Sequence, residues 1–519
     1  MAFIRKGGRC DMSFLLAFCV GFPMAAGVIS YILGRYHKKA RDYFADGAAI
    51  LTFGLLLFLM VQTAAGKISG DFGFTVPGVC GFGLHFALDG FRALYSAIAA
   101  FMWMMTTLFS GEYFAHYRNR NRYYLFLLIT LGATVGVFLS ADFYTTFIFF
   151  EIMSLASYMW VAHDERKESL RAAGTYLAVA VIGGLVMLMG IFLLYSVTGT
   201  LLFEDLKGFL AEYEQKVNVD GSVPGGVRTF WAAGICLLFG FGAKAGAFPL
   251  HIWLPKAHPV APAPASALLS GILTKAGMFG ILVLSDYLFL GNGQWGSLIL
   301  ITGVCTMALG AVLALFSVDL KRTLACSSVS QIGFILVGVG MAGLLGGENL
   351  LATRGALLHM VNHSLIKLVL FMAAGVVFMN VHKLDLNDIR GFGRKKPLLN
   401  YIFLMGALGI GGFPLWDGYI SKTLIHESIV EYTVLLAEGA AAGIFSVGAM
   451  RIIEWIFLIS GGFTVAYMTK LYVVLFLEKN RDEEVQRKFD SLKGAYMNRV
   501  SAFALALPAS LLPIMGFFP

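Results

Sequence analysis

Two short stretches with nearly the same sequence interrupt hydrophobic segments far apart in the chain, GAFPL at 246–250 and GGFPL at 411–415. Proline removes a backbone donor and breaks a helix, and glycine lets the chain turn sharply. A lysine lies near each break, Lys244 before the first and Lys422 after the second. Breaks of this kind at corresponding positions of two halves are typical of transporters with internal repeats, where unwound backbone lines the ion pathway.

The composition of the chain indicates a membrane protein. Its 519 residues are 58% hydrophobic and only 13% charged, whereas soluble domains carry about 25% charged residues. This excludes a soluble multidomain enzyme, a nucleic-acid-binding protein and a disordered protein, despite the net charge of +8. The six cysteines form no CxxC pair and no cluster with histidine, so we expect no iron–sulfur or zinc site and no cofactor in this chain.

The hydrophobic segments predict an all-α polytopic membrane protein with about 14 transmembrane helices, because a span needs about 20 apolar residues. The candidate spans are 13–34, 44–65, 93–113, 122–140, 142–162, 171–199, 229–250, 260–285, 296–317, 323–343, 355–380, 398–436, 451–477 and 500–518. The twelfth is too long for one straight helix, so helices 7 and 12 are expected to be broken.

The spacing of the breaks predicts an internal symmetry. Helices 7 and 12 are five helices apart, and an odd offset gives the two repeat units opposite membrane orientations. We therefore expect two inverted five-helix repeats, helices 4–8 and helices 9–13. The expected divisions are an N-terminal three-helix segment (1–120), the first repeat (121–290), the second repeat (291–480) and a C-terminal loop with the last helix (481–519). Residues 203–216 are expected to form a short amphipathic helix.

The loop charges predict the orientation in the membrane. The loops after odd-numbered helices hold 24 of the lysines and arginines, and the loops on the other side hold 7. By the positive-inside rule, the odd-numbered loops are cytoplasmic and both termini lie on the outer side of the cell inner (cytoplasmic) membrane. The N-terminus disagrees, because it carries Arg5, Lys6 and Arg9.

Five lysines fall inside predicted spans, where a charge costs about 2.5–3.5 kcal/mol at mid-bilayer. Lys470 is close enough to a helix end for its ammonium to reach the interface, so we interpret it as structural. The other four have apolar sequence on both sides and indicate a relay of titratable amines; they are Lys244, Lys275, Lys367 and Lys422.

Other titratable residues accompany these lysines. Glu151 lies in the middle of helix 5 and is expected to pair with a cation from another helix, whereas Asp142 is expected to be a cap of that helix or an interfacial residue. His359, His363 and Lys367 are spaced four residues apart, which places them on one helix face. Two histidines at this spacing can share a metal, but no third ligand type is obvious, so we favour a proton relay.

Several blocks of this sequence resemble the antiporter-like subunits of respiratory complex I, of Mrp-type sodium/proton antiporters and of membrane-bound hydrogenases. The blocks are FFEIMSLASY (149–158), GAKAGAFPLHIWLPKAHPVAPAPASALLSGILTKAG (242–277), DLKRTLACSSVSQIGF (319–334), HMVNHSLIKLVLFMAAG (359–375) and GFPLWDGYISK (412–422). The resemblance implies fourteen helices, two inverted repeats and a hydrated polar axis through the middle of the membrane.

The resemblance also implies a role for each matching residue. Glu151 and Lys244 would form a charge pair, Lys275 would link the two halves, and His359, His363 and Lys367 would form the central relay. Lys422 would stand at the outlet, with exit past Asp417, His426, Glu427 or Glu431. One departure is Thr175, which occupies a position where the family often has lysine.

The function expected from these features is translocation of protons, or of Na⁺, by a membrane subunit of a redox-driven complex resembling complex I or a membrane-bound hydrogenase. The alternative is a component resembling the D-type subunit of an Mrp-type Na⁺/H⁺ antiporter. Redox cofactors and any enzymatic reaction would belong to partner subunits, and other membrane subunits and the lipid bilayer are the expected partners. A stand-alone solute carrier and a non-pumping scaffold protein are the other possibilities.

Overall fold

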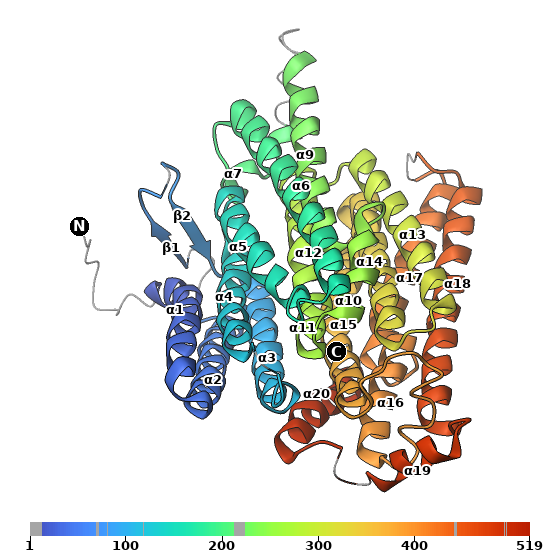
Figure 1. Cartoon of the computed structure of the whole chain (residues 1–519). Helices are drawn as coiled ribbons and strands as arrows, with labels where there is room; N and C mark the ends of the chain where they lie inside the picture. The colour runs from blue at the N-terminus through green and yellow to red at the C-terminus, as the bar shows by residue number, and fades with distance from the viewer. Residues whose placement is uncertain are drawn as a thin grey trace. The chain divides into compact units, whose positions relative to one another are not determined.

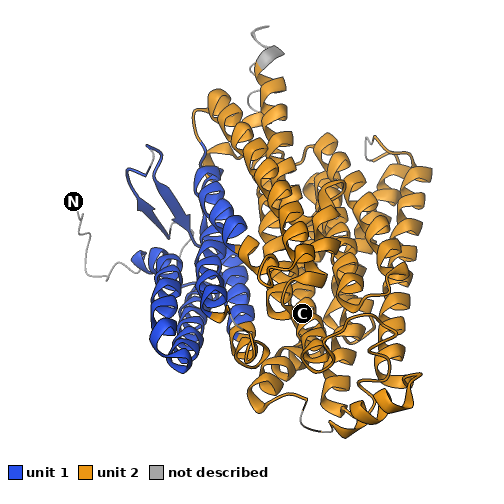
Figure 2. Cartoon of the chain, in the orientation of Figure 1, with its two compact units in different colours: residues 1–104, 121–156, 201–203 blue, residues 105–120, 157–200, 204–519 orange. Residues whose placement is uncertain are grey.

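The computed structural model describes residues 13–68, 72–79, 81–117, 119–211, 224–440, 444–492, 494 and 496–518. The chain forms two compact units (Figure 2). Unit 1 comprises residues 1–104, 121–156 and 201–203, and unit 2 comprises residues 105–120, 157–200 and 204–519. The sequence-based divisions after residues 120, 290 and 480 separate the expected repeats, whereas the two units are the compact parts of the structure. The repeat divisions therefore stay a prediction.

Unit 1 is built from helices and one β-hairpin. Its elements are α1 (Phe14–Tyr36), α2 (Lys38–Ala64), β1 (Gly73–Val76), β2 (Leu84–Ala87), α3 (Gly90–Tyr113), α4 (Arg120–Leu139) and α5 (Phe143–Val161), of which α3, α4 and α5 extend partly into unit 2. The strands are antiparallel, with Gly73 opposite Ala87. A Cβ on Gly27 would meet the carbonyl of Leu125, so α1 and α4 pack closely where a side chain is missing.

Unit 2 contains the remaining helices, most of the long ones running side by side and the short α19 lying across their lower end in the view of Figure 1. They are α6 (Lys167–Thr198), α7 (Phe203–Leu206, whose first residue belongs to unit 1), α9 (Pro224–Ala245), η1 (Leu250–Trp253), α10 (Leu254–Val260), α11 (Ala263–Leu268), η2 (Leu269–Leu273), α12 (Thr274–Val283), η3 (Leu284–Leu288), α13 (Gly293–Phe316), α14 (Leu320–Leu345), η4 (Gly346–Glu348), α15 (Leu350–Val381), α16 (Pro397–Gly411), α17 (Asp417–Ala437), α18 (Val447–Tyr472), η5 (Val473–Leu477), α19 (Glu483–Ser491) and α20 (Arg499–Phe517).

Glycines allow the closest helix packing in unit 2. A Cβ on Gly303 of α13 would meet the backbone of Val337 on α14, and one on Gly340 of α14 would meet the backbone of Leu300. Small residues at such positions let transmembrane helices approach closely enough for extensive van der Waals contact. Helix α14, packed closely against α13 in this way, also packs against α15, which carries the central histidines and lysine.

Both predicted helix breaks are present. Helix α9 ends at Ala245, and Gly246 then adopts a φ of +77°. Helix α16 ends at Gly411, Gly412 adopts a φ of +75°, and α17 begins at Asp417. Only glycine takes up this left-handed backbone conformation at little cost, which is why each helix ends where its glycine stands.

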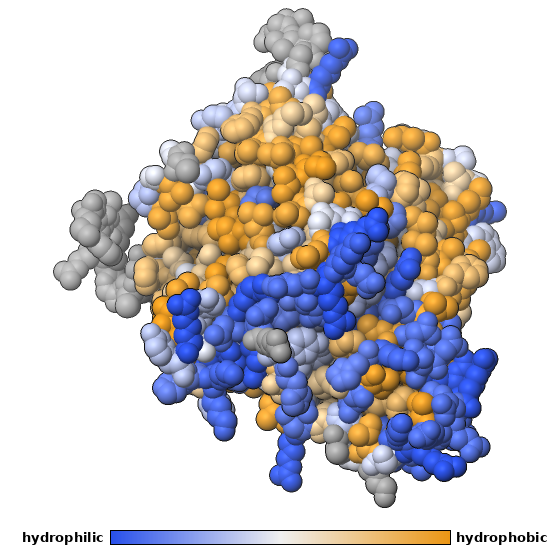
Figure 3. Space-filling model, viewed as in Figure 1, coloured by the Kyte–Doolittle hydropathy of each residue, from blue (hydrophilic) through white to orange (hydrophobic). Residues whose placement is uncertain are grey.

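Twelve helices within the described residues are long and apolar enough to cross a membrane. The segments α5, α16 and α17 lie outside these twelve, so the count of fourteen, like the inverted-repeat symmetry, stays a prediction. Hydrophobic side chains cover much of the face shown in Figure 3, and hydrophilic ones gather where α19 lies. Of the expected amphipathic helix, α7 and the following residues to 211 are described, and 212–216 lie outside the described residues.

Candidate polar axis for ion transfer

Lys244 is the last residue but one of α9, directly before the first break. It is buried and donates a hydrogen bond to Tyr176 Oη over 2.6 Å, with its Nζ 5.0 Å from the centre of the Tyr176 ring. Tyr176 Oη in turn lies 2.6 Å from Ser157 Oγ. A phenol and a hydroxyl both donate and accept, so this chain of three groups can hand on a proton.

Glu151 belongs to unit 1, eight residues after the first residue of α5, and is half-buried. Lys244 belongs to unit 2, so their pairing stays a prediction. Asp142, at the start of α5, accepts hydrogen bonds from the backbone and hydroxyl groups of Thr145, both over 2.6 Å. It therefore caps this helix, as the sequence predicted.

Lys275 and His363 form the first link of a buried polar axis in unit 2. Lys275 is fully buried on α12, and its Nζ lies 2.7 Å from His363 Nδ1 on α15. The same amine donates to the Ser270 carbonyl over 2.8 Å, within the π-helical turn η2. A π-helical turn offsets the backbone carbonyls of the helix, and such turns are frequent at functional sites. Two titratable groups from separate helices are thus in direct contact.

Lys367 lies one helical turn beyond His363 on α15 and is fully buried. Its Nζ donates to the Leu324 carbonyl over 2.8 Å and to Ser327 Oγ, both on α14. Ser327 Oγ donates onward to the same Leu324 carbonyl over 2.8 Å. The amine is therefore held by carbonyl and hydroxyl dipoles of the neighbouring helix.

His359 connects the axis to the second helix break. Its Nε2 lies 3.0 Å from Gln331 Oε1 on α14, and its Nδ1 lies 2.9 Å from Ser421 Oγ on α17. The rings of His359 and His363 are nearly parallel, with centroids 6.3 Å apart. Both ring nitrogens of His359 have partners, whereas His363 has a partner at Nδ1 and its buried Nε2 has none among the described residues. Among the described residues, no group of three or more possible metal ligands occurs.

Lys422 lies on α17 beside the second break. Its Nζ donates to the Ile410 carbonyl over 2.7 Å, at the open end of α16, and lies 4.8 Å from the centre of the Phe334 ring. The C-terminal carbonyls of a helix have no intrahelical donors and carry partial negative charge, which favours a cation there. The break therefore supplies the site that holds this lysine.

The axis is rich in amines but has few acids. Within the described residues, no ion pair joins Lys275, Lys367 or Lys422 to a carboxylate. Burying an ammonium without a counter-charge costs several kcal/mol. Each amine can consequently release a proton without leaving a buried carboxylate unpaired. Such an arrangement favours proton transfer but does not stabilise the folded protein.

The expected exit residues lie around α17. Asp417 is buried at its first turn, where Oδ1 accepts from the Gly418 amide over 2.9 Å and Oδ2 has no partner among the described residues. His426 Nε2 lies 3.1 Å from Glu454 on α18, and its Nδ1 lies 3.6 Å from Glu427. Glu431 is half-buried further along α17. The structure thus assembles Asp417, Lys422 and His426 on one helix but joins none of them directly.

Sequence reasoning missed several partners of these residues. Tyr176, Gln331 and Ser421 each hold a titratable residue, and Glu454 pairs with His426. Gln331 could have been noticed, because an amide inside an apolar span needs a partner. Tyr176 adjoins Thr175, the departure noted from the sequence.

Lys321 and Lys470 are held in different ways. Lys321 is one of the 24 charges that the sequence places in the odd-numbered loops, but it is buried at the start of α14 and donates to the Ala261 carbonyl over 2.8 Å. Lys470 is half-buried and donates to the carbonyls of Leu315 and Ser317, both over 2.7 Å. These bonds cap the end of α13, which agrees with a structural role for Lys470.

The chain is similar to components of several membrane complexes. It is 30% identical over 403 residues to hydrogenase-4 component B of Escherichia coli (strain K12), covering 76% of this chain and 57% of that protein. It is 30% identical over 513 residues to the A-type subunit of the Na(+)/H(+) antiporter of Alkalihalophilus pseudofirmus, covering 96% and 60% respectively. With the D-type subunit of the antiporter from the same organism it shares 28% identity over 410 residues, covering 79% and 76%. The chain thus spans about 60% of the length of the first two relatives.

Two solved structures share the fold. One protein of the membrane-bound sulfane sulfur reductase, an archaeal respiratory membrane complex, superposes with a TM-score of 0.79 at 22% identity, covering 97% of this chain and 94% of that one. One protein of the Mrp complex from Dietzia sp. DQ12-45-1b superposes with a TM-score of 0.77 at 21% identity, covering 97% and 95%.

The family model described as "NADH:quinone oxidoreductase/Mrp antiporter, TM" matches residues 140–447, which include every relay and exit residue expected from the sequence. Together with the matching folds, this shows that the chain is an antiporter-like membrane subunit belonging to the NADH:quinone oxidoreductase/Mrp antiporter family.

Proposed function

We propose that this chain translocates protons, or Na⁺, across the membrane as one subunit of a redox-driven complex that resembles complex I or a membrane-bound hydrogenase. The observation that carries the proposal is the contact between Lys275 and His363, two buried titratable groups brought together from α12 and α15. No structural need explains a lysine and a histidine in direct contact inside an apolar bundle. Ionisable residues in a membrane interior are by default part of an ion pathway.

The proposed proton route begins at Lys244 and reaches the histidines of α15 through Lys275. A proton on Lys244 leaves when its predicted partner Glu151 moves away, because the loss of a nearby negative charge destabilises an ammonium. Water then carries it to Lys275, whose contact with His363 delivers it to the face of α15 that also bears His359 and Lys367. The coupled groups titrate together, so no single residue owns the transferred proton.

The outlet is at the second helix break. Ser421 accepts or donates to His359 and adjoins Lys422, which is held at the open end of α16. From Lys422 the ion leaves past Asp417 or along the His426, Glu427 and Glu431 side of α17. Partner subunits would supply the redox chemistry and its cofactors, because the residues of this axis are proton carriers.

A matched pair of lysine substitutions tests the proposal. The complex containing this chain is purified, reconstituted into vesicles and energised, and internal acidification is followed with a pH-sensitive dye. We expect Lys367→Met to abolish the acidification attributable to this chain while the complex still assembles. Lys470→Met, which removes a lysine that only caps α13, should leave pumping intact. Normal pumping by the Lys367→Met complex would contradict the relay.

An Mrp-type antiporter is the second candidate, because the similarity to the D-type subunit of a Na(+)/H(+) antiporter covers 76% of that protein. Purification of the tagged chain in mild detergent followed by mass spectrometry separates the candidates. Iron–sulfur or hydrogenase-type partners would establish a redox-driven pump. Small membrane partners alone would establish a cation/proton antiporter, and the isolated chain alone would favour a solute carrier.

A further inference from the structure

A groove of about 520 Å³ opens on the surface of unit 2, beside the segment that follows the first helix break. Its walls come from η1 and α10, from the end of α13 with the loop after it, and from the first turns of α14. None of the relay or exit residues described above lines this groove. Its volume falls within the range of about 300–1,000 Å³ that is usual for ligand pockets, so it has room for much more than a few waters.

Two basic side chains line the groove. Lys256 on α10 and Arg322 on α14 are exposed, and neither forms an ion pair among the described residues. The acid of the lining is Asp319, whose Oδ1 accepts from the Arg322 backbone amide over 2.7 Å and so caps α14. Lys470 adds a positive charge behind the wall, because its amine binds the carbonyl of Ser317, which lines the groove. The groove therefore has a net positive charge.

The rest of the groove is apolar and exposed. The exposed fractions are 78% for Phe316, 61% for Val318 and 47% for Ile252, and Val312 and Leu313 are also exposed. Contiguous apolar surface of this kind marks a site of contact with lipid or with another protein. The occupant of the groove must consequently combine an anionic part with an apolar part.

The charged and apolar parts follow each other as in one leaflet of a membrane. Ile252 lies one helical turn before Lys256, and Phe316 is the last residue of α13. Arg322 lies in the first turn of α14, directly after the loop 317–319. This loop and the end of α10 follow the odd-numbered predicted helices 9 and 7, so the charge rule places the basic mouth of the groove on the cytoplasmic side.

We propose that this groove binds an anionic phospholipid of the cytoplasmic leaflet, with its phosphate between Lys256 and Arg322. An acyl chain of the lipid lies against Ile252, Val312 and Phe316. Basic pockets between transmembrane helices on the cytoplasmic side bind anionic headgroups, and a guanidinium group can hold a phosphate through two parallel hydrogen bonds. The bilayer supplies the anion and the apolar chain in one molecule, whereas a partner helix would need acidic side chains at this one depth.

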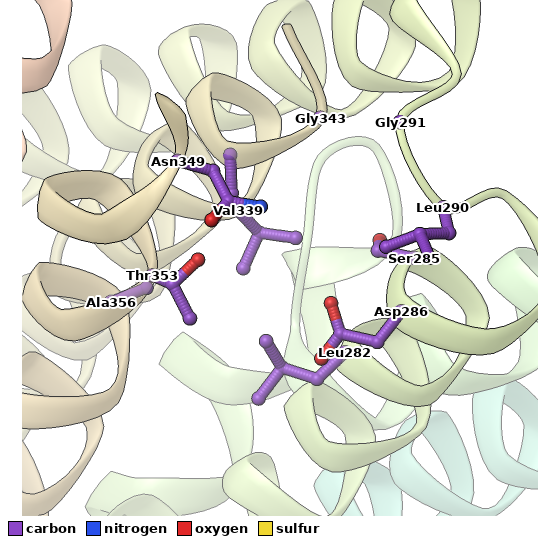
Figure 4. A pocket seen from close by; sticks show the side chains of 11 residues that line it. Leu282, Ser285, Asp286, Leu290, Gly291, Val339, Gly343, Asn349, Thr353 and Ala356 are labelled. Carbon is purple, nitrogen blue, oxygen red and sulfur yellow. The ribbon is translucent and has the colours of Figure 1, made fainter. Parts of the chain in front are cut away.

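A second cavity in unit 2 lacks both of these features. It lies between η3 and the facing ends of α14 and α15 (Figure 4), and its volume of about 20 Å³ is room for about one water. The charged residue among those that line it is Asp286, an acid. The lipid site is thus specific to the groove. The inference does not rest on the proposed function, because no charged residue of the groove belongs to the polar axis.

Photo-crosslinking identifies the occupant of the groove. The photoreactive amino acid p-benzoylphenylalanine replaces Phe316, and the intact complex is reconstituted into vesicles with equal parts of anionic phosphatidylglycerol and zwitterionic phosphatidylcholine. Phe192 is the control position, because it is exposed on α6 and does not line the groove. After illumination, mass spectrometry identifies the molecules attached to each position.

The two positions should give different adducts. We expect position 316 to attach mainly to phosphatidylglycerol, whereas position 192 attaches to both lipids alike. Equal attachment of the two lipids at position 316, or attachment to another polypeptide of the complex, would overturn the proposal.

Removing both cations supplies an independent measurement. The double variant Lys256→Gln with Arg322→Gln is compared with Lys479→Gln with Arg481→Gln, which removes two exposed charges outside the groove. The purified complex is stripped of lipid in detergent and titrated with phosphatidylglycerol, and bound lipid is counted by native mass spectrometry. Each basic residue near an anionic headgroup contributes about fivefold in binding, so the first variant should bind about thirtyfold more weakly and the second as the wild type does.

Two results of this titration would contradict the proposal. One is equal binding of phosphatidylglycerol by the wild type and both double variants. The other is displacement of the lipid by inorganic phosphate, which would identify a site for the free anion instead of a lipid.

Discussion

Replacing Lys275 with methionine should separate the function of the buried amine from its contribution to stability. Methionine is also a long, unbranched side chain and fills irregular gaps in cores well. The substitution removes the bond to the Ser270 carbonyl and the contact with His363 Nδ1, each shorter than 3 Å. It also removes a fully buried amine that has no carboxylate in contact among the described residues.

The two energetic effects oppose each other. Losing the hydrogen bonds and leaving His363 Nδ1 without its partner costs about 1–3 kcal/mol. Removing an ammonium from a site without a counter-charge gains several kcal/mol, and replacing buried ionic groups by apolar side chains is often neutral or stabilising by about 1–4 kcal/mol. We therefore expect Lys275→Met to be at least as stable as the wild type.

Transport by the Lys275→Met variant should fall, although its stability should not. Removing one group from a proton relay takes away an acid–base step worth about 10²–10⁴ in rate, so pumping through this chain should fall about 100-fold or more. Thermal unfolding of the purified complex and acidification of reconstituted vesicles measure the two quantities on one preparation. A variant that unfolds at clearly lower temperature yet still pumps would show that Lys275 is structural and refute the reasoning.

Three further substitutions probe the surroundings of the axis. Gly418→Ala would place a methyl group against the Gly409 carbonyl and displace α17 from α16. We expect it to cost about 1–3 kcal/mol of stability, measured by thermal unfolding, and to lower transport in the acidification assay. Lys470→Gln should lower stability by about 1 kcal/mol through the lost cap on α13 and leave transport unchanged in the same assays. Burial lowers the pKa of Lys396 from its ordinary 10.5 to about 8, against the opposing charge of Asp490. As the pH rises, the folded state therefore loses this proton at a lower pH than the unfolded state does, so stability should rise between about pH 8 and 10.5. Unfolding temperatures measured across this range should rise for the wild type and rise less for Lys396→Met.

The helix breaks could be predicted because their causes are local. Proline lacks a backbone donor and glycine accepts a positive φ, and these properties belong to single residues. The chain accordingly leaves the helix at Gly246 and Gly412, within the two stretches that the sequence marks. The short hairpin of β1 and β2 was not expected, because GFTV and LHFA are too short to give a clear alternation.

The contacts of the titratable residues could not be predicted, because they depend on which helices become neighbours. His359 bonds to Gln331, 28 positions earlier, and to Ser421, 62 positions later. Helix periodicity places His359 and His363 on one face, but it does not say what that face meets. Lys321 shows the same difficulty, since a lysine at a helix start looks like a loop charge until packing buries it.

The contacts also show why burial alone does not identify a relay lysine. Lys470 and Lys275 both lie within apolar segments, and both donate to backbone carbonyls. A carbonyl can only accept, so the carbonyls that hold Lys470 cannot pass its proton on. Lys275 differs because it also contacts Nδ1 of His363, and an imidazole ring can both accept and donate a proton. The contact with a second titratable group therefore distinguishes Lys275 from Lys470, and it is the contact that the Lys275→Met experiment removes.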